Sequence, residues 1–150
     1  MTTVYDVPAE ALIRETASQL TKDKAMVAPE WAPFVKTGAH REKTPESEDW
    51  WHVRCAAILR KVYMKGPIGT ERLAAEFGGY RDRGARPNRA VAGSGSIARK
   101  GLQQLESAGL LTNVKGRGRS ISPKGQALLD NAAHVVKQKL VKEIPGLAKY

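Results

Sequence analysis

Arginine side chains are concentrated in residues 78–102, whose sequence is GGYRDRGARPNRAVAGSGSIARKGL. The guanidinium group offers planar, paired donors to phosphate oxygens and can stack on an unpaired base. Glycine and serine between the arginines let a phosphate approach the backbone, and N–H groups at the start of a helix favour an anion. We therefore expect contacts to a phosphate backbone from Arg81, Arg83, Arg86, Arg89, Ser94, Ser96, Arg99 and Lys100.

A second basic group lies at a predicted turn between two short apolar stretches, and consists of Lys115, Arg117 and Arg119. A charged run is by default a solvated face of the protein. Here the loop, the following helix start and the turn all carry cations, and the predicted fold brings them near one another. This recurrence favours one basic binding surface over general solubilising charge.

The charge of the chain is unevenly distributed. Its 25 lysines and arginines and 15 acidic residues give a net charge of +10. Residues 81–124 hold ten basic groups against Asp82 and Glu106, whereas residues 1–50 are richer in acidic groups. Such a localised excess favours a polyanionic partner, and nucleic acid is the leading candidate.

Residues that could support catalysis or hold a metal do not combine into a site. His52 and Cys55 stand three positions apart, but a structural zinc needs four ligands. The GSGSIA stretch at 93–98 imitates a dinucleotide-binding pattern, yet no apolar strand precedes it and no βαβ unit follows. We expect no enzymatic activity, metal, cofactor or small-molecule substrate. The single cysteine and the lack of a long apolar run predict a cytoplasmic protein without a membrane partner.

The periodicity of apolar residues predicts a single domain, residues 1–150, of mainly α class. We expect a winged helix-turn-helix core with a β-hairpin wing at 110–122 and additional N- and C-terminal helices. Asp6, Thr70, Ser96 and Ser122 are the expected helix caps. The predicted helices cover 8–20, 50–65, 70–77, 96–108 and a last stretch from Pro123; the predicted strands are 110–114 and 119–122.

Two long connections separate these elements. The first, a wrapping loop at 22–49, contains Trp31 and Phe34, which we expect to hold it against the core. The second is the basic loop at 78–95. A DNA-reading helix-turn-helix has a turn of only three or four residues, so a loop of this length suits an irregular folded RNA better than a regular duplex.

The central helix, 50–65, combines an apolar stripe with a basic line. Trp51 belongs to the stripe, whereas the adjacent Trp50 either packs under the wrapping loop or stacks on RNA, with packing favoured. Arg54 is either a partner of an acidic residue in that loop, Glu46 or Glu48, or a phosphate ligand. Arg60 is expected to point away from the core.

Several blocks in register resemble one family: APEW at 28–31, DWWHVRCAAILRKVY at 49–63, FGGYRDRG at 77–84, GSGSIARKGLQQLE at 93–106 and GRSISPKGQ at 118–126. Together they are similar, over nearly the whole chain, to the archaeal and eukaryotic small-subunit ribosomal protein family S19e, and more to its archaeal members. The wing tip, KGRGR, departs from the family pattern, so individual contacts there do not carry over.

The resemblance implies a place in the head of the small ribosomal subunit, bound to ribosomal RNA beside neighbouring ribosomal proteins and assembly factors. It also implies a requirement in maturation of the subunit's precursor RNA. Positions that the family uses for structure or RNA contact are matched by Trp50, Arg54, Arg60, Arg99 and Lys100. Structural roles are expected for Trp31, Trp50 and Trp51. The alternative function is that of a winged-helix regulator of transcription on duplex DNA.

Overall fold

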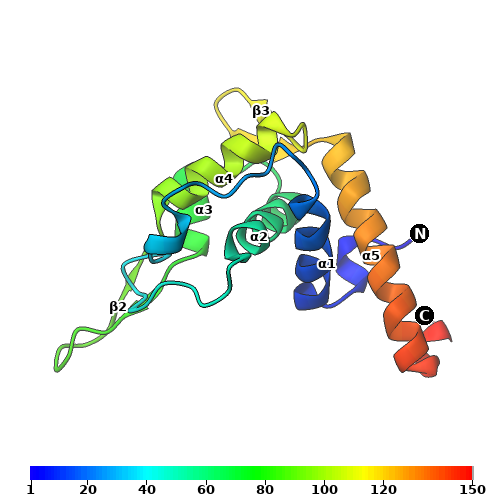
Figure 1. Cartoon of the computed structure of the whole chain (residues 1–150), viewed down its shortest axis with the longest axis horizontal. Coiled ribbons are helices and arrows are strands. Elements are labelled where there is room, and N and C mark those ends of the chain that lie inside the picture. Colours follow the sequence, from blue (N-terminus) through cyan, green and yellow to red (C-terminus); the bar gives the residue numbers. More distant parts are fainter. Residues whose placement is uncertain (150) are drawn as a thin grey trace.

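Helix α2 (Trp50–Lys65) runs through the middle of the molecule, because its apolar side chains recur every three or four residues and form one stripe. Helices α1 (Ala9–Thr21) and α4 (Gly95–Ser107) pack against it, and α1 also packs on α5 (Pro123–Glu143). Figure 1 shows α1 and α5 on one side of α2, with α3 (Thr70–Glu76) and α4 on the other. The α2 side chains that are fully buried in this core are Trp51, Cys55, Ala56, Ile58, Leu59 and Val62.

The computed structural model describes residues 1–149 of the chain. Besides the α-helices it contains two antiparallel hairpins, so the prediction of a mainly α fold with a β-hairpin is confirmed. The order α2, α3, α4, hairpin is the one expected from the sequence. The hairpins are β1 (Gly79–Arg81) with β2 (Arg89–Val91), and β3 (Leu111–Val114) with β4 (Gly118–Ile121); 3-10 turns lie at Val4–Asp6, Ala32–Phe34 and Pro145–Lys149.

The β1–β2 hairpin corrects the prediction of an irregular basic loop at 78–95. Its register pairs Tyr80 with Ala90 and Arg81 with Arg89. Six residues in ladder positions are too few for period-two alternation to stand out, and apart from Tyr80 and Val91 they lack the β-branched and aromatic types that mark a strand. The sequence therefore concealed a β-ribbon between α3 and α4.

Three of the expected helix caps are displaced. Gly69 precedes α3, and Ser94 caps α4 by accepting a hydrogen bond on Oγ from the Ile97 N–H at 3.4 Å. Asp6 does not cap α1, because it lies in a preceding 3-10 turn where its Oδ2 accepts the Thr3 N–H at 2.6 Å. Ser122 caps α5 as expected, accepting the Gly125 N–H at 3.0 Å.

The β3–β4 hairpin is fastened to the connection between α2 and α3. Ile68 and Arg119 exchange two backbone hydrogen bonds, each 3.0 Å long. The neighbouring Gly118 has φ of +101°, and a Cβ there would lie 2.4 Å from the Ile68 carbonyl oxygen. Only glycine fits this close backbone approach, which fixes the hairpin beside the helical core.

The wrapping segment at 22–49 is held by Trp31 but not by Phe34. The Trp31 ring meets Trp51 edge to face, with centroids 5.7 Å apart, and Trp50 is packed with 8% of its surface exposed. All three tryptophan rings therefore pack into or against the core. The expectation for Phe34 is wrong, because this ring is 82% exposed.

Gln104 of α4 ties the same segment to the core. Its Oε1 accepts the indole N–H of Trp51 at 2.9 Å, and its Nε2 donates to the Val27 carbonyl at 2.7 Å. One side chain thus gives a hydrogen-bond partner to the indole N–H of the core and to a backbone carbonyl of the wrapping segment. A polar group that is buried without such a partner costs free energy. In Figure 1 the segment lies across α4.

Candidate nucleic-acid interface

The β1–β2 hairpin gathers the four arginines that the sequence singled out in this region. Their side chains are exposed and surround a hollow of about 490 Å³ that Asp82 also lines; they are Arg81, Arg83, Arg86 and Arg89. Asp82 Oδ1 accepts the Gly84 N–H at 2.9 Å and so shapes the turn. No carboxylate among residues 1–149 forms an ion pair with these arginines. Their charge is therefore available to an external anion.

Helix α4 begins next to the base of this hairpin. Arg99 and Lys100 are exposed on its first two turns, and Ser96 is exposed three and four residues before them. Residues at these spacings share a helix face. Ser94 differs from Ser96, because its hydroxyl is already used as the helix cap. The exposed face of α4 thus continues the basic surface of the hairpin with the cations of Arg99 and Lys100 and the hydroxyl group of Ser96.

The wing divides into an exposed tip and a tethered base. Lys115 and Arg117 at the tip are exposed, as expected. Arg119 is only 19% exposed, and its Nε donates to Glu106 Oε2 of α4 at 2.7 Å. The structure therefore gives Arg119 a structural ion pair, whereas the two tip residues remain available.

The expectation of one convergent basic surface is wrong for the wing. Figure 1 shows the β1–β2 hairpin projecting from the N-terminal end of α4, whereas β3 follows its C-terminal end. A helix of 13 residues is about 20 Å long. The cations therefore form two regions, the arginine hairpin with the start of α4 and the separate wing tip.

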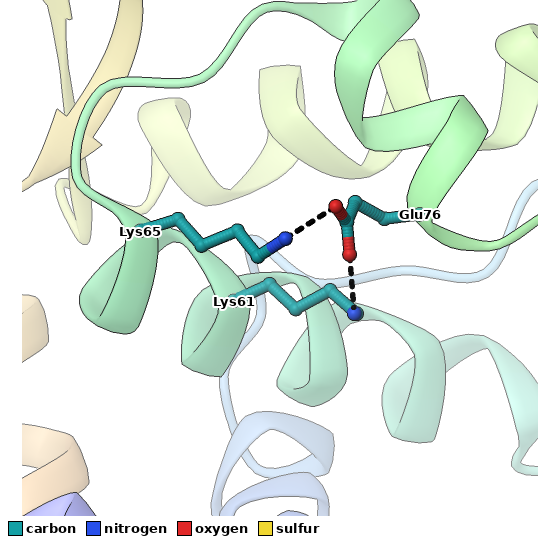
Figure 2. Close-up of polar contacts among 3 residues, drawn as sticks. All are labelled: Lys61, Lys65 and Glu76. Atoms are coloured by element: carbon teal, nitrogen blue, oxygen red, sulfur yellow. Dashed lines mark hydrogen bonds and ion pairs between the residues drawn. The ribbon is translucent and has the colours of Figure 1, made fainter.

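The basic line on α2 is occupied by α3. Lys61 and Lys65 both bind the carboxylate of Glu76, and the Lys61 contact is 3.0 Å long (Figure 2). Hydrogen bonds from Lys65 and Lys61 lower the pKa of Glu76 from 4.5 to about 2. Since both lysines have an internal partner, this side of α2 is a helix–helix contact.

Among the described residues Arg54 forms no ion pair with Glu46 or Glu48, which was one of the two roles that the sequence left open. Its guanidinium lies over the Phe77 ring, 4.3 Å from the centroid. Arg54, Phe77 and Glu46 line one hollow, but Glu46 forms no ion pair among the described residues. Burial, followed by the nearby Arg41, lowers the pKa of this guanidinium. A cation–π contact stabilises α2 against the end of α3, and a phosphate contact remains a prediction.

Arg60 corrects a further expectation. Its side chain is half-buried, and its Nε is inaccessible to solvent with no hydrogen-bond partner in the described part of the chain. It therefore does not point freely away from the core. The helical spacing of α2 predicted its apolar stripe correctly. It did not predict how far the rest of the protein covers the positions beside that stripe, such as Arg60.

His52 and Cys55, the two residues considered as metal ligands, have different environments in the structure. Cys55 is fully buried, and burial raises the pKa of its thiol to about 12. His52 Nε2 lies 2.8 Å from the Met26 carbonyl oxygen. Within residues 1–149 no group of three or more metal-ligating side chains comes together, and no helix is long and apolar enough to cross a membrane.

Sequence reasoning missed two exposed rings near the basic region. Tyr80 is 78% exposed on β1, and Phe34 is exposed beside the start of α4. An aromatic residue next to arginine, as in the Tyr80-Arg81 pair, was an available signal for a nucleic-acid surface. Nothing in the local pattern around Phe34 distinguishes an exposed ring from a buried one.

The helical core and the exposed arginine hairpin make this a small basic protein of mainly α class. A family model described as Ribosomal protein S19e matches residues 3–139, so the chain belongs to this family. It is a constituent of the small ribosomal subunit and not an enzyme, and the family places it on the ribosome in the cytoplasm.

Relatives named as small ribosomal subunit protein eS19, eS19A or eS19B cover 87–100% of the chain. The protein from Aeropyrum pernix is 47% identical over all of this chain and 99% of its own length. The one from Haloarcula marismortui is 43% identical over 89% of this chain and 90% of its own. The eukaryotic eS19B of Schizosaccharomyces pombe is 42% identical over 87% and 92%, respectively.

Proposed function

We propose that the chain binds small-subunit ribosomal RNA through the β1–β2 hairpin and the exposed face of α4. The observation that carries the proposal is the set of four exposed hairpin arginines that have no carboxylate partner within residues 1–149. Holding four like charges together is unfavourable in the isolated protein. A phosphate backbone offsets this repulsion, which makes the hairpin a surface shaped for an external polyanion.

The insertion of a β-ribbon between α3 and α4 favours RNA over the alternative of a DNA-binding regulator. In a DNA-reading helix-turn-helix, a turn of three or four residues sets the recognition helix against its support. Here the ribbon projects from the entry to α4 (Figure 1) and would meet a regular duplex before the helix did. A folded RNA, with loops and uneven grooves, can receive both elements.

The proposal extends to assembly of the subunit. A protein that neutralises phosphates of two RNA segments at once lowers the repulsion between them, and the two separate basic regions suit such a role. We place the chain in the head of the small subunit, in contact with neighbouring ribosomal proteins and assembly factors. Maturation of the precursor RNA would then depend on the chain because folding of that RNA depends on it.

The test compares two double variants with the same loss of charge. Arg81→Ala/Arg83→Ala removes two hairpin arginines, whereas Arg14→Ala/Lys139→Ala removes two cations that pair with Glu10 and Glu15 on α1. Affinity for purified small-subunit ribosomal RNA is measured by filter binding. The hairpin variant should bind at least tenfold more weakly than the control; equal affinities would contradict the proposal.

Salt dependence gives a second readout of the same contacts. Each neutralised phosphate contributes about 0.7–0.9 to the slope of log affinity against log salt. The hairpin variant should therefore lower the slope by roughly 1.4–1.8 if both arginines contact phosphates. A slope that does not change would show that neither arginine neutralises a phosphate, and would contradict the proposed contacts.

A further inference from the structure

The exposed Phe34 ring borders a hollow of about 610 Å³ between the wrapping segment and the start of α4. Trp31, Lys36, Ser94 and Ser96 also line it. Burying a phenylalanine side chain is worth about 1.5–3 kcal/mol relative to leaving it exposed. An 82% exposed ring at the edge of a hollow therefore forgoes stabilisation that the fold could have used.

The position of Phe34 is set by the structure around it and not by a loose loop. Ala32 of the same 3-10 turn is buried, and Trp31 packs edge to face on Trp51. Three residues after Phe34, the Thr37 carbonyl accepts the Ser94 N–H at 3.0 Å. Contacts on both sides thus hold the backbone in place and leave the ring facing solvent next to α4.

The polar surroundings of the ring select its occupant. Lys36 is exposed at the hollow, and Ser96 shares a helix face with Arg99 and Lys100. Lys36 lines the hollow, and Arg99 and Lys100 follow on the adjoining face of α4. An apolar side chain of another protein would gain nothing from these cations. An unpaired nucleotide presents both a flat apolar face for the ring and phosphates for the cations.

We propose that Phe34 is a stacking platform for one unpaired RNA base, with Lys36 and the exposed face of α4 holding the flanking phosphates. This inference rests on the proposed function, because it identifies the kind of RNA that this surface takes. Bases within a duplex have both faces stacked and cannot reach the ring. The hollow therefore selects a single-stranded or looped stretch, while the arginine hairpin contacts phosphates of any RNA.

The experiment measures affinity for a fluorescein-labelled r(A)12 single strand and for the r(A)12·r(U)12 duplex at one salt concentration. Phe34→Ala should weaken single-strand binding by roughly 5- to 100-fold, as expected for loss of one base–aromatic stack, and leave duplex binding within twofold. Phe34→Trp should restore the affinity of the original protein. Phe34→Leu keeps apolar surface but loses the aromatic face, so it should resemble Phe34→Ala.

A matched control is Tyr5→Ala, which removes another exposed ring, 63% exposed and in contact with Tyr63 near the N-terminus. It should not change binding to either RNA. The Phe34 variants should unfold at the same temperature as the original protein, because the ring contributes little burial. This measurement separates an effect on binding from an effect on folding.

The results that would contradict the stacking platform differ from those that would contradict the proposed function. Full single-strand affinity of Phe34→Ala, or of Phe34→Leu, would overturn the stacking platform. In the second case the contact with RNA would depend on apolar surface and not on an aromatic face. Lack of r(A)12 binding by a chain that binds ribosomal RNA would also overturn it. Lack of binding to ribosomal RNA by the unaltered protein would instead refute the proposed function.

Discussion

Helix α2 and the β1–β2 hairpin both carry several cations, yet the two regions use them in opposite ways. On α2, Lys61 and Lys65 bind Glu76, and Arg54 lies over Phe77. On the hairpin, the arginines have no carboxylate partner within residues 1–149. The contrast shows that the surroundings of a cation in the fold, and not its presence in the sequence, decide whether its charge is already used within the protein.

The largest expected effect belongs to the core that α2 builds. Trp51→Ala removes a fully buried ring that also donates a hydrogen bond to Gln104, so it should lower the free energy of unfolding by about 3–5 kcal/mol. Urea denaturation measures the change. Tyr80→Ala on the hairpin is the matched control and should stay within ~0.5 kcal/mol. Similar losses in both variants would erase the contrast between the regions.

A smaller effect should separate two arginines of the wing. Arg119→Ala breaks a half-buried pair with Glu106, and we expect a loss of about 1–2 kcal/mol, between the values for exposed and buried pairs. Arg117→Ala at the exposed tip should leave stability unchanged. Thermal unfolding of both variants decides the matter. An equally stable Arg119→Ala protein would return this residue to the candidates for RNA contact.

Acid should weaken the α2–α3 contact through Glu76. Its pKa falls from 4.5 to about 2 on folding, so the stabilisation is present above pH 4.5 and is lost as the pH falls from about 4.5 to about 2. The melting temperature of Glu76→Gln should vary less with pH over this window than that of the original protein. Parallel pH profiles for the two proteins would mean that the lysines of α2 do not depend on this carboxylate.

The smallest effect on stability is expected on the hairpin itself. Arg81→Ala/Arg83→Ala should change the free energy of unfolding by no more than ~0.5 kcal/mol, because these side chains are exposed and form no ion pair in the described part of the chain. Relief of like-charge repulsion could only raise stability. Chemical denaturation at low salt gives the most sensitive measurement. A marked destabilisation would show that the hairpin arginines hold the fold together, as the cations of α2 do.

Local patterns predicted the elements whose signal lies within a few residues. The apolar stripe of α2, the Ser122-Pro123 start of α5 and the glycine-rich turn of the wing all appear in the structure. The β1–β2 ribbon was missed because its strands are three residues long and rich in arginine. The cap of α4 was misplaced by two residues because Ser94 and Ser96 have the same capping chemistry.

The candidate site was only partly accessible to such reasoning. The four hairpin arginines, with Arg99 and Lys100, are exposed as the sequence predicted, since polar segments without apolar spacing cannot be buried. Arg119 was expected to be exposed but is mostly buried, and Phe34 was expected to be buried but is exposed. One found a carboxylate on α4, and the other found no covering element, and both facts depend on segments distant in the sequence.

By itself the sequence determined the helical core, the excess of positive charge in residues 81–124 and the membership of the S19e family, because periodicity, charge and motif spacing are properties of neighbouring residues. Only the tertiary structure decided which cations remain unpaired and which aromatic rings face solvent. Those outcomes depend on which side chains the packing of α2, α3 and α4 brings within a few ångströms of one another, and no local pattern encodes that distance.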